Sequence, residues 1–298
     1  MLFLLTAVYT TLVILTPTKS LHLNPKTNAL IKGNPIRKYE GLKVVPNEII
    51  SVDDNLTVEE AMAITVNGEN FTVTMRTPGD ELELVRGLLH SEDIYRNREI
   101  NPDVVDTETN DMGFISKVHL QIPKELLGSG YKNSRSLLSV SSCGICGKQE
   151  LIDIVPEAQI DTGNLKIGLE EIRKMYAIME NGQVQFEKSG GIHAAAIFNS
   201  QYELLSLKED IGRHNAVDKA IGDLLLTQRL KTAEFLLVSG RVSYEIITKA
   251  FAARIPFLAA VSAPSSLAVD YAKELGITLM GFCRENKFTV YAHPERII

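Results

Sequence analysis

Alternating apolar and polar residues predict a β-hairpin over residues 63–75. The sequence AITVNGENFTVTM has apolar residues at every second position on both sides of residues 67–70, and Asn-Gly favours a turn. After Pro78-Gly79 the apolar spacing becomes that of a short helix, whose expected apolar face is Leu82, Val85, Leu88 and Leu89. Two further strands are expected over residues 114–122 and 137–140. Residues 38–150 are therefore expected to be mostly β.

Helical spacing appears from residue 151 onward. Leu169, Ile172, Met175, Tyr176 and Met179 mark one helix, which Asn181-Gly182 is expected to end. The segments IHAAAIF and YELLSL, joined at residues 199–201, predict a pair of strands. Apolar positions at helical spacing predict a second helix through Val217, Ala220, Ile221, Leu224 and Leu225.

Three nearly continuous apolar segments follow: FLLVSG from Phe235, FLAAVS from Phe257 and ITLMGF from Ile277. Such segments are typical of strands buried on both faces, and helical stretches over 244–254 and 265–275 separate them. The resulting β-α-β-α-β order predicts a parallel sheet, with KFTVYAHP as a final edge strand. The expected fold class is α/β, or α+β for the whole chain, with a mostly parallel sheet and a smaller β-rich N-terminal domain.

The predicted organisation has three parts: a leader and linker over 1–37, a β-rich domain over 38–150 and an α/β domain over 151–298. Residues 1–16 are apolar and uncharged, yet they lack a basic n-region and a small-x-small cleavage site, and they are short for a bilayer span. We interpret them as a non-functional leader or an upstream-extended start. A signal or anchor is the alternative.

Composition and charge exclude several classes of protein. With 45% hydrophobic and 23% charged residues, the 298-residue chain has an ordinary globular composition and is neither disordered nor collagen-like. A net charge of −6 argues against general affinity for nucleic acid. Three cysteines are too few for a secreted disulfide scaffold and fit a reducing cytoplasm.

The carboxyl ends of the three predicted parallel strands form a candidate ligand site. They carry Ser239-Gly240-Arg241, residues 262–266 and Cys283-Arg284. In open α/β sheets ligands bind beyond these ends, where helix N-termini favour anions and arginine can form two hydrogen bonds to a phosphate. A nucleotide or phosphate pocket is one interpretation. Ordinary helix caps are the other.

The C-x-x-C pair formed by Cys143 and Cys146 allows several chemistries. A structural zinc site needs four ligands and this pair supplies two, while a zinc deaminase would need H-x-E, whereas His193 is followed by two alanines. A thioredoxin-type dithiol would sit in a small βαβ domain. A disulfide across so short a loop would add little stability.

A sulfur-carrying thiolate is the remaining chemistry for this pair. Gly144 and Gly147 favour a mobile loop, and Lys148 would lower the thiol pKa, which favours the reactive thiolate. Cys143 is the candidate persulfide carrier, and Cys146 is expected to assist or resolve. Residue chemistry alone leaves this as one option among several.

The stretch KEDIGRHNAVDKAIG, residues 208–222, is the second dense polar segment. Its ionisable and polar residues are Glu209, Asp210, Arg213, His214, Asn215, Asp218 and Lys219. Clustered ionisable groups at a strand-to-helix turn are a functional candidate, and a solvated helix end is the alternative. His193, in GGIHAA, stands in an apolar strand, where a histidine is more often a core residue.

These stretches together resemble the FdhD/NarQ family of accessory sulfurtransferases for formate dehydrogenase, over residues 38–298. The resemblance rests on SSCGICGK, MRTPGDELELVRGLL, GGIHAAAIF, EDIGRHNAVDKAIG, FTVYAHPERI and the long segment from SGRVSYEII to MGFCREN. It implies a cytidine deaminase-like C-terminal domain without the deaminase zinc residues. It further implies a sulfur carrier that takes sulfur from a cysteine desulfurase as a persulfide.

The resemblance also implies an acceptor, partners and site residues. The acceptor would be the molybdenum cofactor bis(molybdopterin guanine dinucleotide), or bis-MGD, before its insertion into the catalytic subunit of formate dehydrogenase. Cys143 and Cys146 match the catalytic positions, and the expected cofactor-binding residues are Phe282, Cys283, Arg284, Glu285, Asn286 and Lys287, with help from Arg213, His214 and Arg241. No structural metal, nucleic acid or membrane partner is expected. The protein is expected to act as a cytoplasmic homodimer. A cofactor-binding chaperone and a zinc-dependent deaminase-like hydrolase are the alternatives.

Overall fold

The computed structural model describes residues 33–95, 97–134, 159–160, 162–284 and 287–298, and its strands form three sheets. The sheets have the orders β1-β2, β4-β3-β6-β5 and β12-β11-β10-β9-β7-β8. The strands are β1 (Ile36–Val45), β2 (Glu48–Thr57), β3 (Glu60–Val66), β4 (Glu69–Arg76), β5 (Asp103–Thr109), β6 (Ile115–Gln121), β7 (His193–Phe198), β8 (Leu204–Asp210), β9 (Phe235–Val238), β10 (Phe257–Ala260), β11 (Thr278–Arg284) and β12 (Lys287–Ala292). The strand predicted at residues 137–140 lies outside the described residues.

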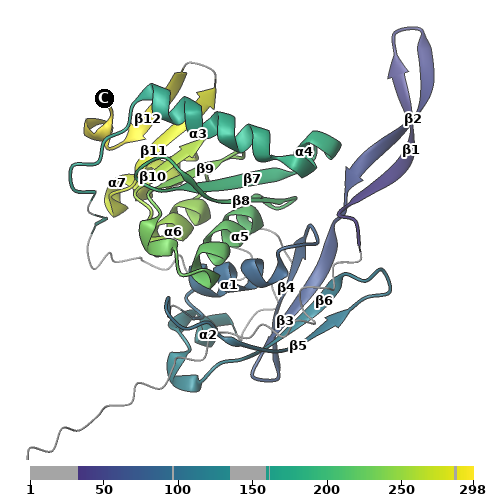
Figure 1. The fold of residues 1–298 in the computed structure, drawn as a ribbon, viewed down its shortest axis with the longest axis horizontal. Coiled ribbons are helices and arrows are strands. Elements are labelled where there is room, and N and C mark those ends of the chain that lie inside the picture. The colour runs from purple at the N-terminus through teal and green to yellow at the C-terminus, as the bar shows by residue number, and fades with distance from the viewer. Residues whose placement is uncertain (1–32, 96, 135–158, 161, 285–286) are drawn as a thin grey trace, which may run out of the picture.

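Helices separate and cover the two larger sheets, so that the molecule is layered (Figure 1). The helices are α1 (Glu81–Ser91), α2 (Ser129–Ser134), α3 (Leu169–Gly182), α4 (Val184–Ser189), α5 (Arg213–Leu226), α6 (Tyr244–Ala253) and α7 (Ser266–Leu275). The order of layers is α3, the six-stranded sheet, α5 to α7, α1 and the four-stranded sheet. The α/β fold class with a β-rich N-terminal part is thereby confirmed.

The six-stranded sheet is mixed, with a parallel centre. Strands β9, β10 and β11 pair in parallel, as their order in the chain predicted. Strand β7 pairs antiparallel with both β8 and β9, and β12 pairs antiparallel with β11. Short connections force the β7-β8 and β11-β12 pairings, because parallel strands need a long crossover and these strands are joined by a few residues only. Parallel pairing is thus confined to the three central strands.

Both faces of this sheet are buried, which explains the continuous apolar segments. In β9, Leu236 and Val238 pack toward α5 to α7, while Phe235 and Leu237 pack toward α3. A strand covered on both sides has no solvent face on which polar residues would alternate. The helix periodicities that predicted α3, α5, α6 and α7 supply the covering faces.

The predicted N-terminal hairpin is β3-β4, with a turn shorter than expected. Only Asn67 and Gly68 lie between the strands, and both have positive φ, 54° and 81°. This is the left-handed backbone that tight hairpins need and that Asn-Gly adopts readily. Helix α1 packs on this sheet through Leu84, Val85 and Leu89. Leu82 and Leu88, which were predicted on the buried face, are only partly buried.

Glycines let α1 cross α5 at backbone contact. A Cβ atom added to Gly87 would stand 1.9 Å from the carbonyl oxygen of Asp218, and one added to Gly222 would stand 1.8 Å from that of Glu83. At such distances a side chain at either position would force the two helices apart. The two glycines therefore fix how the N-terminal layers sit on the C-terminal ones.

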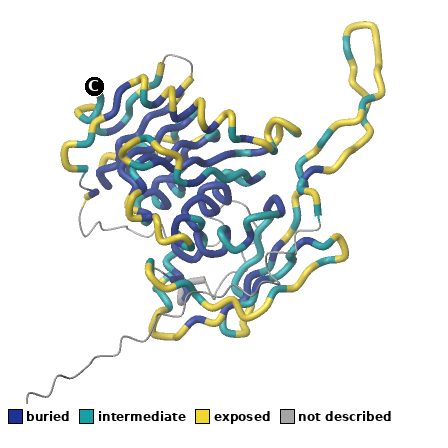
Figure 2. The backbone as a smooth tube through the Cα atoms, viewed as in Figure 1, coloured by how far each residue is buried: buried dark blue, intermediate teal, exposed yellow. Residues whose placement is uncertain are grey.

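The β1-β2 hairpin projects from the body and is mostly exposed (Figures 1 and 2). Leu42 and Val44 are each 73% exposed, so apolar side chains face solvent along this arm. Its base is fixed to α4, where the hydroxyls of Thr57 and Ser189 lie 2.7 Å apart. Sequence patterning indicated β structure here without indicating a projecting arm. Within the described ranges, no helix has the length and apolar character needed to cross a membrane.

Candidate functional site

The polar segment 208–222 divides into two groups of side chains, and the first group joins the N-terminal layers to α5. Asp210 forms an ion pair with Lys219 (2.8 Å) and accepts hydrogen bonds from the backbone N–H groups of Thr77 (3.1 Å) and Gly212 (2.8 Å). Asn215 donates to the carbonyl of Met75 at 2.8 Å. These side chains are buried and satisfied, so their role is to hold the layers together.

A second buried ion pair lies further along the same junction. Both carboxylate oxygens of Asp218 lie 2.8 Å from the Lys249 ammonium, and Ser91 donates to Asp218 at 2.8 Å. Burial alone would lower the pKa of Lys249, but Asp218 and Glu92 outweigh it and raise that pKa above its ordinary value. The lysine is thus charged, and the pair connects α1, α5 and α6.

The second group is Arg213 and His214, in the first turn of α5. His214 Nε2 lies 3.1 Å from the Ser243 hydroxyl and 3.8 Å from a Glu245 carboxylate oxygen. Burial tends to raise the pKa of Glu245, but the Ser243 hydroxyl, its own backbone, His214 and Arg213 outweigh it and lower that pKa. Glu245 is therefore an anion that holds the His214 ring beside the start of α6.

His193 belongs to the same site, although the sequence indicated a core residue. It begins β7, where it is half-buried, and its ring stands beside Gly240 and Arg213. A Cβ atom added to Gly240 would lie 3.3 Å from His193 Nδ1 and 3.4 Å from Arg213 Cβ. Burial, and then the positive charges of Arg213 and Arg241, lower the pKa of His193. Position at the first residue of the strand was the available signal, because strand ends reach the sheet edge.

Backbone hydrogen bonds join the loops after β9 and β10 and the last residues of β11 into one continuous edge. Val242 N–H donates to Ala263 (3.2 Å), Ser265 N–H donates to Val242 (2.9 Å), and Phe282 N–H donates to Ser262 (3.2 Å). Helices α5, α6 and α7 begin along this edge, so their N-terminal N–H groups and dipoles add positive potential. Arg241 and Arg284 are exposed here. The edge suits an anion.

The predicted cofactor-binding stretch 282–287 is placed in part. Phe282 is 46% exposed with φ of 53°, and Arg284 and Lys287 are exposed and paired in register across β11 and β12. The Arg284 Nε donates to the Val261 carbonyl at 3.4 Å. Glu285, Asn286, Cys143 and Cys146 lie outside the described residues.

Cys283 differs from its neighbours because its side chain is buried on the α3 face of the sheet, near Tyr176. Burial raises the pKa of this thiol to about 11. Only the backbone of Cys283 is thus available to a ligand at the edge.

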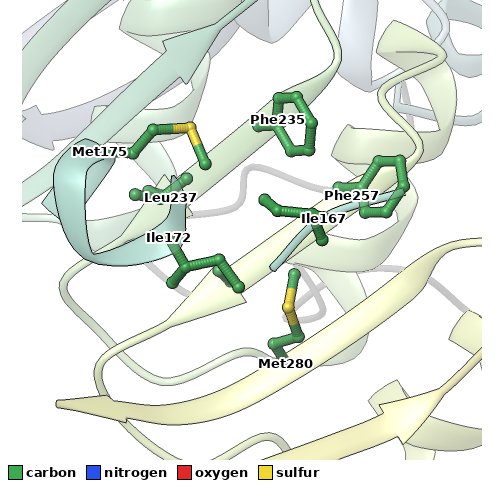
Figure 3. Close-up of a pocket in the computed structure, with 8 residues that line it drawn as sticks. Ile167, Ile172, Met175, Phe235, Leu237, Phe257 and Met280 are labelled. Carbon is green, nitrogen blue, oxygen red and sulfur yellow. The ribbon is translucent and has the colours of Figure 1, made fainter. Parts of the chain in front are cut away.

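An apolar pocket lies inside the core rather than at this edge (Figure 3). It is lined by Ile167, Ile172, Met175, Phe235, Leu237, Phe257, Ala259 and Met280. These side chains come from α3, the segment before it and the strands beneath, and none offers a polar group. The pocket is a packing gap of the core and not a ligand site.

In the part of the chain that the structure describes, His, Cys, Asp and Glu side chains form no group of three that could hold a metal ion. In the H-x-E pattern of zinc deaminases, the glutamate position after His193 corresponds to Ala195. Ala195 is fully buried against the helices. The acid/base of a deaminase is therefore missing at this position.

The sequence profile of the FdhD/NarQ family matches residues 57–298. The chain belongs to this family. A relative named sulfur carrier protein FdhD, from Sulfolobus acidocaldarius, is 40% identical over 88% of this chain and 98% of its own length. A relative of the same name from Nocardia farcinica is 39% identical over 90% of this chain and 96% of its own length.

A solved structure has the same fold at lower identity. It is a crystal structure from Desulfotalea psychrophila, provisionally described as a formate dehydrogenase accessory protein. The TM-score is 0.67 at 22% identity, over 89% of this chain and all of that one.

Proposed function

We propose that this protein is a sulfur carrier for formate dehydrogenase maturation. Cys143 takes sulfur from a cysteine desulfurase as a persulfide and passes it to bis-MGD, which is bound at the carboxyl edge of the six-stranded sheet. The sulfurated cofactor then enters the catalytic subunit of formate dehydrogenase. The acting form is a cytoplasmic homodimer.

The observation that carries this proposal is the cationic edge, together with the family's sulfur-carrier relatives. Bis-MGD contains two guanosine diphosphate diesters, so each half brings a diphosphate. Arg213, Arg241 and Arg284 are available there, and arginine binds phosphate oxygens through paired N–H donors. The Arg213 Nε is buried and makes no hydrogen bond within the described residues, which leaves a donor for a ligand.

The sulfur steps balance with the residues that the chain supplies. The Cys143 thiolate attacks the outer sulfur of the desulfurase persulfide, a new S–S bond forms, and the desulfurase thiolate leaves. Delivery of that sulfur as sulfide needs two electrons. Attack by the Cys146 thiolate on Cys143 supplies them by forming a Cys143–Cys146 disulfide, which a cellular dithiol then reduces.

Persulfide mapping tests the carrier role. The full-length protein is incubated with a cysteine desulfurase and cysteine, and intact and peptide masses are measured without reductant. We expect one added sulfur on the peptide that carries Cys143. Cys143→Ala should lose the added sulfur, and Cys283→Ala, which keeps the C-x-x-C pair, should retain it. Equal loading of Cys143→Ala would overturn the assignment.

A second assay separates the carrier from a cofactor chaperone. The double variant Cys143→Ser, Cys146→Ser is tested for activation of formate dehydrogenase in cells that lack the endogenous protein. Loss of activation supports sulfur transfer. Full activation would show that the cysteines are dispensable and that binding at the edge is the whole function.

A further inference from the structure

His193 stands where it can contact whatever anion occupies the edge. Its ring borders Gly240, a position without a side chain, and faces the first turn of α5 across it. Within the described residues neither ring nitrogen makes a hydrogen bond. The backbone next to the ring is held by the neighbouring strand, because Ala194 N–H donates to the Ser239 hydroxyl at 2.9 Å. The ring is thus positioned and its nitrogens are available.

Burial and the charges around this ring favour its neutral form in the free protein. Burial is the main cause of the lowered pKa of His193, and Arg213 on α5 and Arg241 after β9 lower it further by opposing a third positive charge. Asp210, at the end of β8, favours the charged ring. The Asp210 carboxylate, however, is already shared among Lys219, Asn215 and the N–H groups of Thr77 and Gly212.

We infer that His193 is an anion-binding residue that takes up a proton when a diphosphate occupies the edge between Arg213 and Arg241. This inference rests on the proposed function. It adds His193 to the residues that bind the ligand, and it adds proton uptake to the binding reaction. The incoming negative charge offsets the two arginines and offers an oxygen acceptor to the imidazolium. Ligand binding and protonation then reinforce one another.

Linkage fixes the sign of the pH dependence. The free ring has a lowered pKa and the occupied ring a higher one, so binding consumes a proton in the interval between the two values. Affinity therefore decreases as pH rises through that interval, with a slope of up to about tenfold per pH unit. Below and above this interval the affinity does not depend on pH through His193.

The test uses a probe whose own charge is constant. GDP-mannose shares guanosine and a diphosphate diester with bis-MGD, and its phosphates carry no proton between about pH 6 and pH 8.5. Calorimetry is performed on the full-length protein across this range, in two buffers of different ionisation enthalpy. We expect weaker binding at higher pH, and a heat difference between buffers that reports uptake of up to one proton.

Two variants make the test specific. His193→Gln keeps a hydrogen-bond donor without a titrating ring and should abolish both the slope and the proton uptake. Arg241→Gln should weaken binding across the range and retain proton uptake. A wild-type protein that binds without slope or proton uptake, or a His193→Gln variant that keeps both, would overturn the inference and leave the proposed function intact. No binding at any pH would overturn both.

Discussion

Two regions of this molecule are rich in charged residues, and the charged side chains have different environments and roles in each. At the junction between α1 and α5, the Asp210–Lys219 and Asp218–Lys249 pairs are buried and matched. At the carboxyl edge of the six-stranded sheet, Arg241 and Arg284 are exposed, and no carboxylate in the described part of the chain forms an ion pair with either. One polar segment, residues 208–222, contributes to both regions.

The difference shows that residue type alone does not separate stability from binding. A buried charge that has a partner is satisfied by the protein and is costly to disturb. A cation beside helix N-termini without a carboxylate partner retains its capacity for a ligand. Partner geometry therefore predicts which substitutions will unfold the protein and which will only weaken binding.

The largest effect is expected from Lys249→Met at the junction. It leaves Asp218 buried without its cation, which costs about 3–5 kcal/mol of unfolding free energy at neutral pH. Urea unfolding measures this. Burial raises the Asp218 pKa, and loss of the lysine raises it further, so the carboxyl protonates readily in the variant. The cost should therefore shrink as pH falls through the raised pKa of Asp218 in the folded variant.

Lys231→Met is the matched control for this substitution. Lys231 forms an ion pair of 2.7 Å with Glu99, but the two side chains are 71% and 73% exposed. No measurable change in unfolding is expected, because water replaces the partner at little cost. Equal destabilisation by the two substitutions would contradict the distinction between buried and exposed pairs.

A smaller loss of stability is expected from Gly222→Ala. In a helix interior this change normally adds about 0.5–1 kcal/mol of stability. Here the new methyl group would stand 1.8 Å from the Glu83 carbonyl oxygen, so α1 must move away from α5. We expect a net loss of about 1–3 kcal/mol by urea unfolding. A gain in stability would show that the helices do not cross as described.

At the edge, Gly240→Ala should affect binding more than folding. The added methyl group would press against His193 and the base of Arg213, at 3.3 Å and 3.4 Å. We expect about tenfold weaker GDP-mannose binding, equivalent to about 1.4 kcal/mol, with unfolding little changed. Gly191→Ala is the control, because the nearest atom to its new methyl group is 3.8 Å away. Unchanged affinity in Gly240→Ala would place the ligand elsewhere.

The smallest effect is expected at Cys283, which is next to the edge in sequence and away from it in structure. In a Cys143→Ser, Cys146→Ser background, Cys283 is the one remaining thiol. With a pKa of about 11, roughly one thiol in a thousand is ionised at pH 8. Iodoacetamide labelling should be slow in the native protein and rapid in urea. Rapid native labelling would show that the side chain reaches the edge.

The sequence predicted the individual strands and helices better than the way in which they pair and pack. Apolar periodicity predicted β9 to β11 and their parallel pairing, because a strand buried on both faces is apolar throughout. It predicted β7 and β8 as a pair, but it could not reveal the antiparallel β7-β9 pairing or the projecting β1-β2 arm, since these depend on contacts between distant segments. Leu82 and Leu88 pack against the same core as Val85 and Leu89, as predicted, but are less buried than these.

The sequence predicted where in the fold the candidate site lies, but it did not predict which residues form it. The rule that ligands bind at the carboxyl ends of parallel strands located Arg241 and Arg284. It gave no reason to separate Arg213 and His214 from Asp210, Asn215, Asp218 and Lys219. The partners of these four residues lie more than a hundred residues away, in residues 75–91, or 31 residues away on α6. His193 was missed because the apolar residues that follow it indicate a buried strand, and they do not show that the first residue of this strand lies at the edge of the sheet.

The most direct test of the cationic edge compares Arg241→Gln with Lys249→Met in paired measurements of GDP-mannose affinity and urea unfolding. We expect Arg241→Gln to lose about tenfold or more in affinity with wild-type stability. Lys249→Met should lose stability and, where it is folded, bind as the wild type does. Wild-type affinity in Arg241→Gln, or a loss of stability equal to that of Lys249→Met, would contradict a ligand site at this edge.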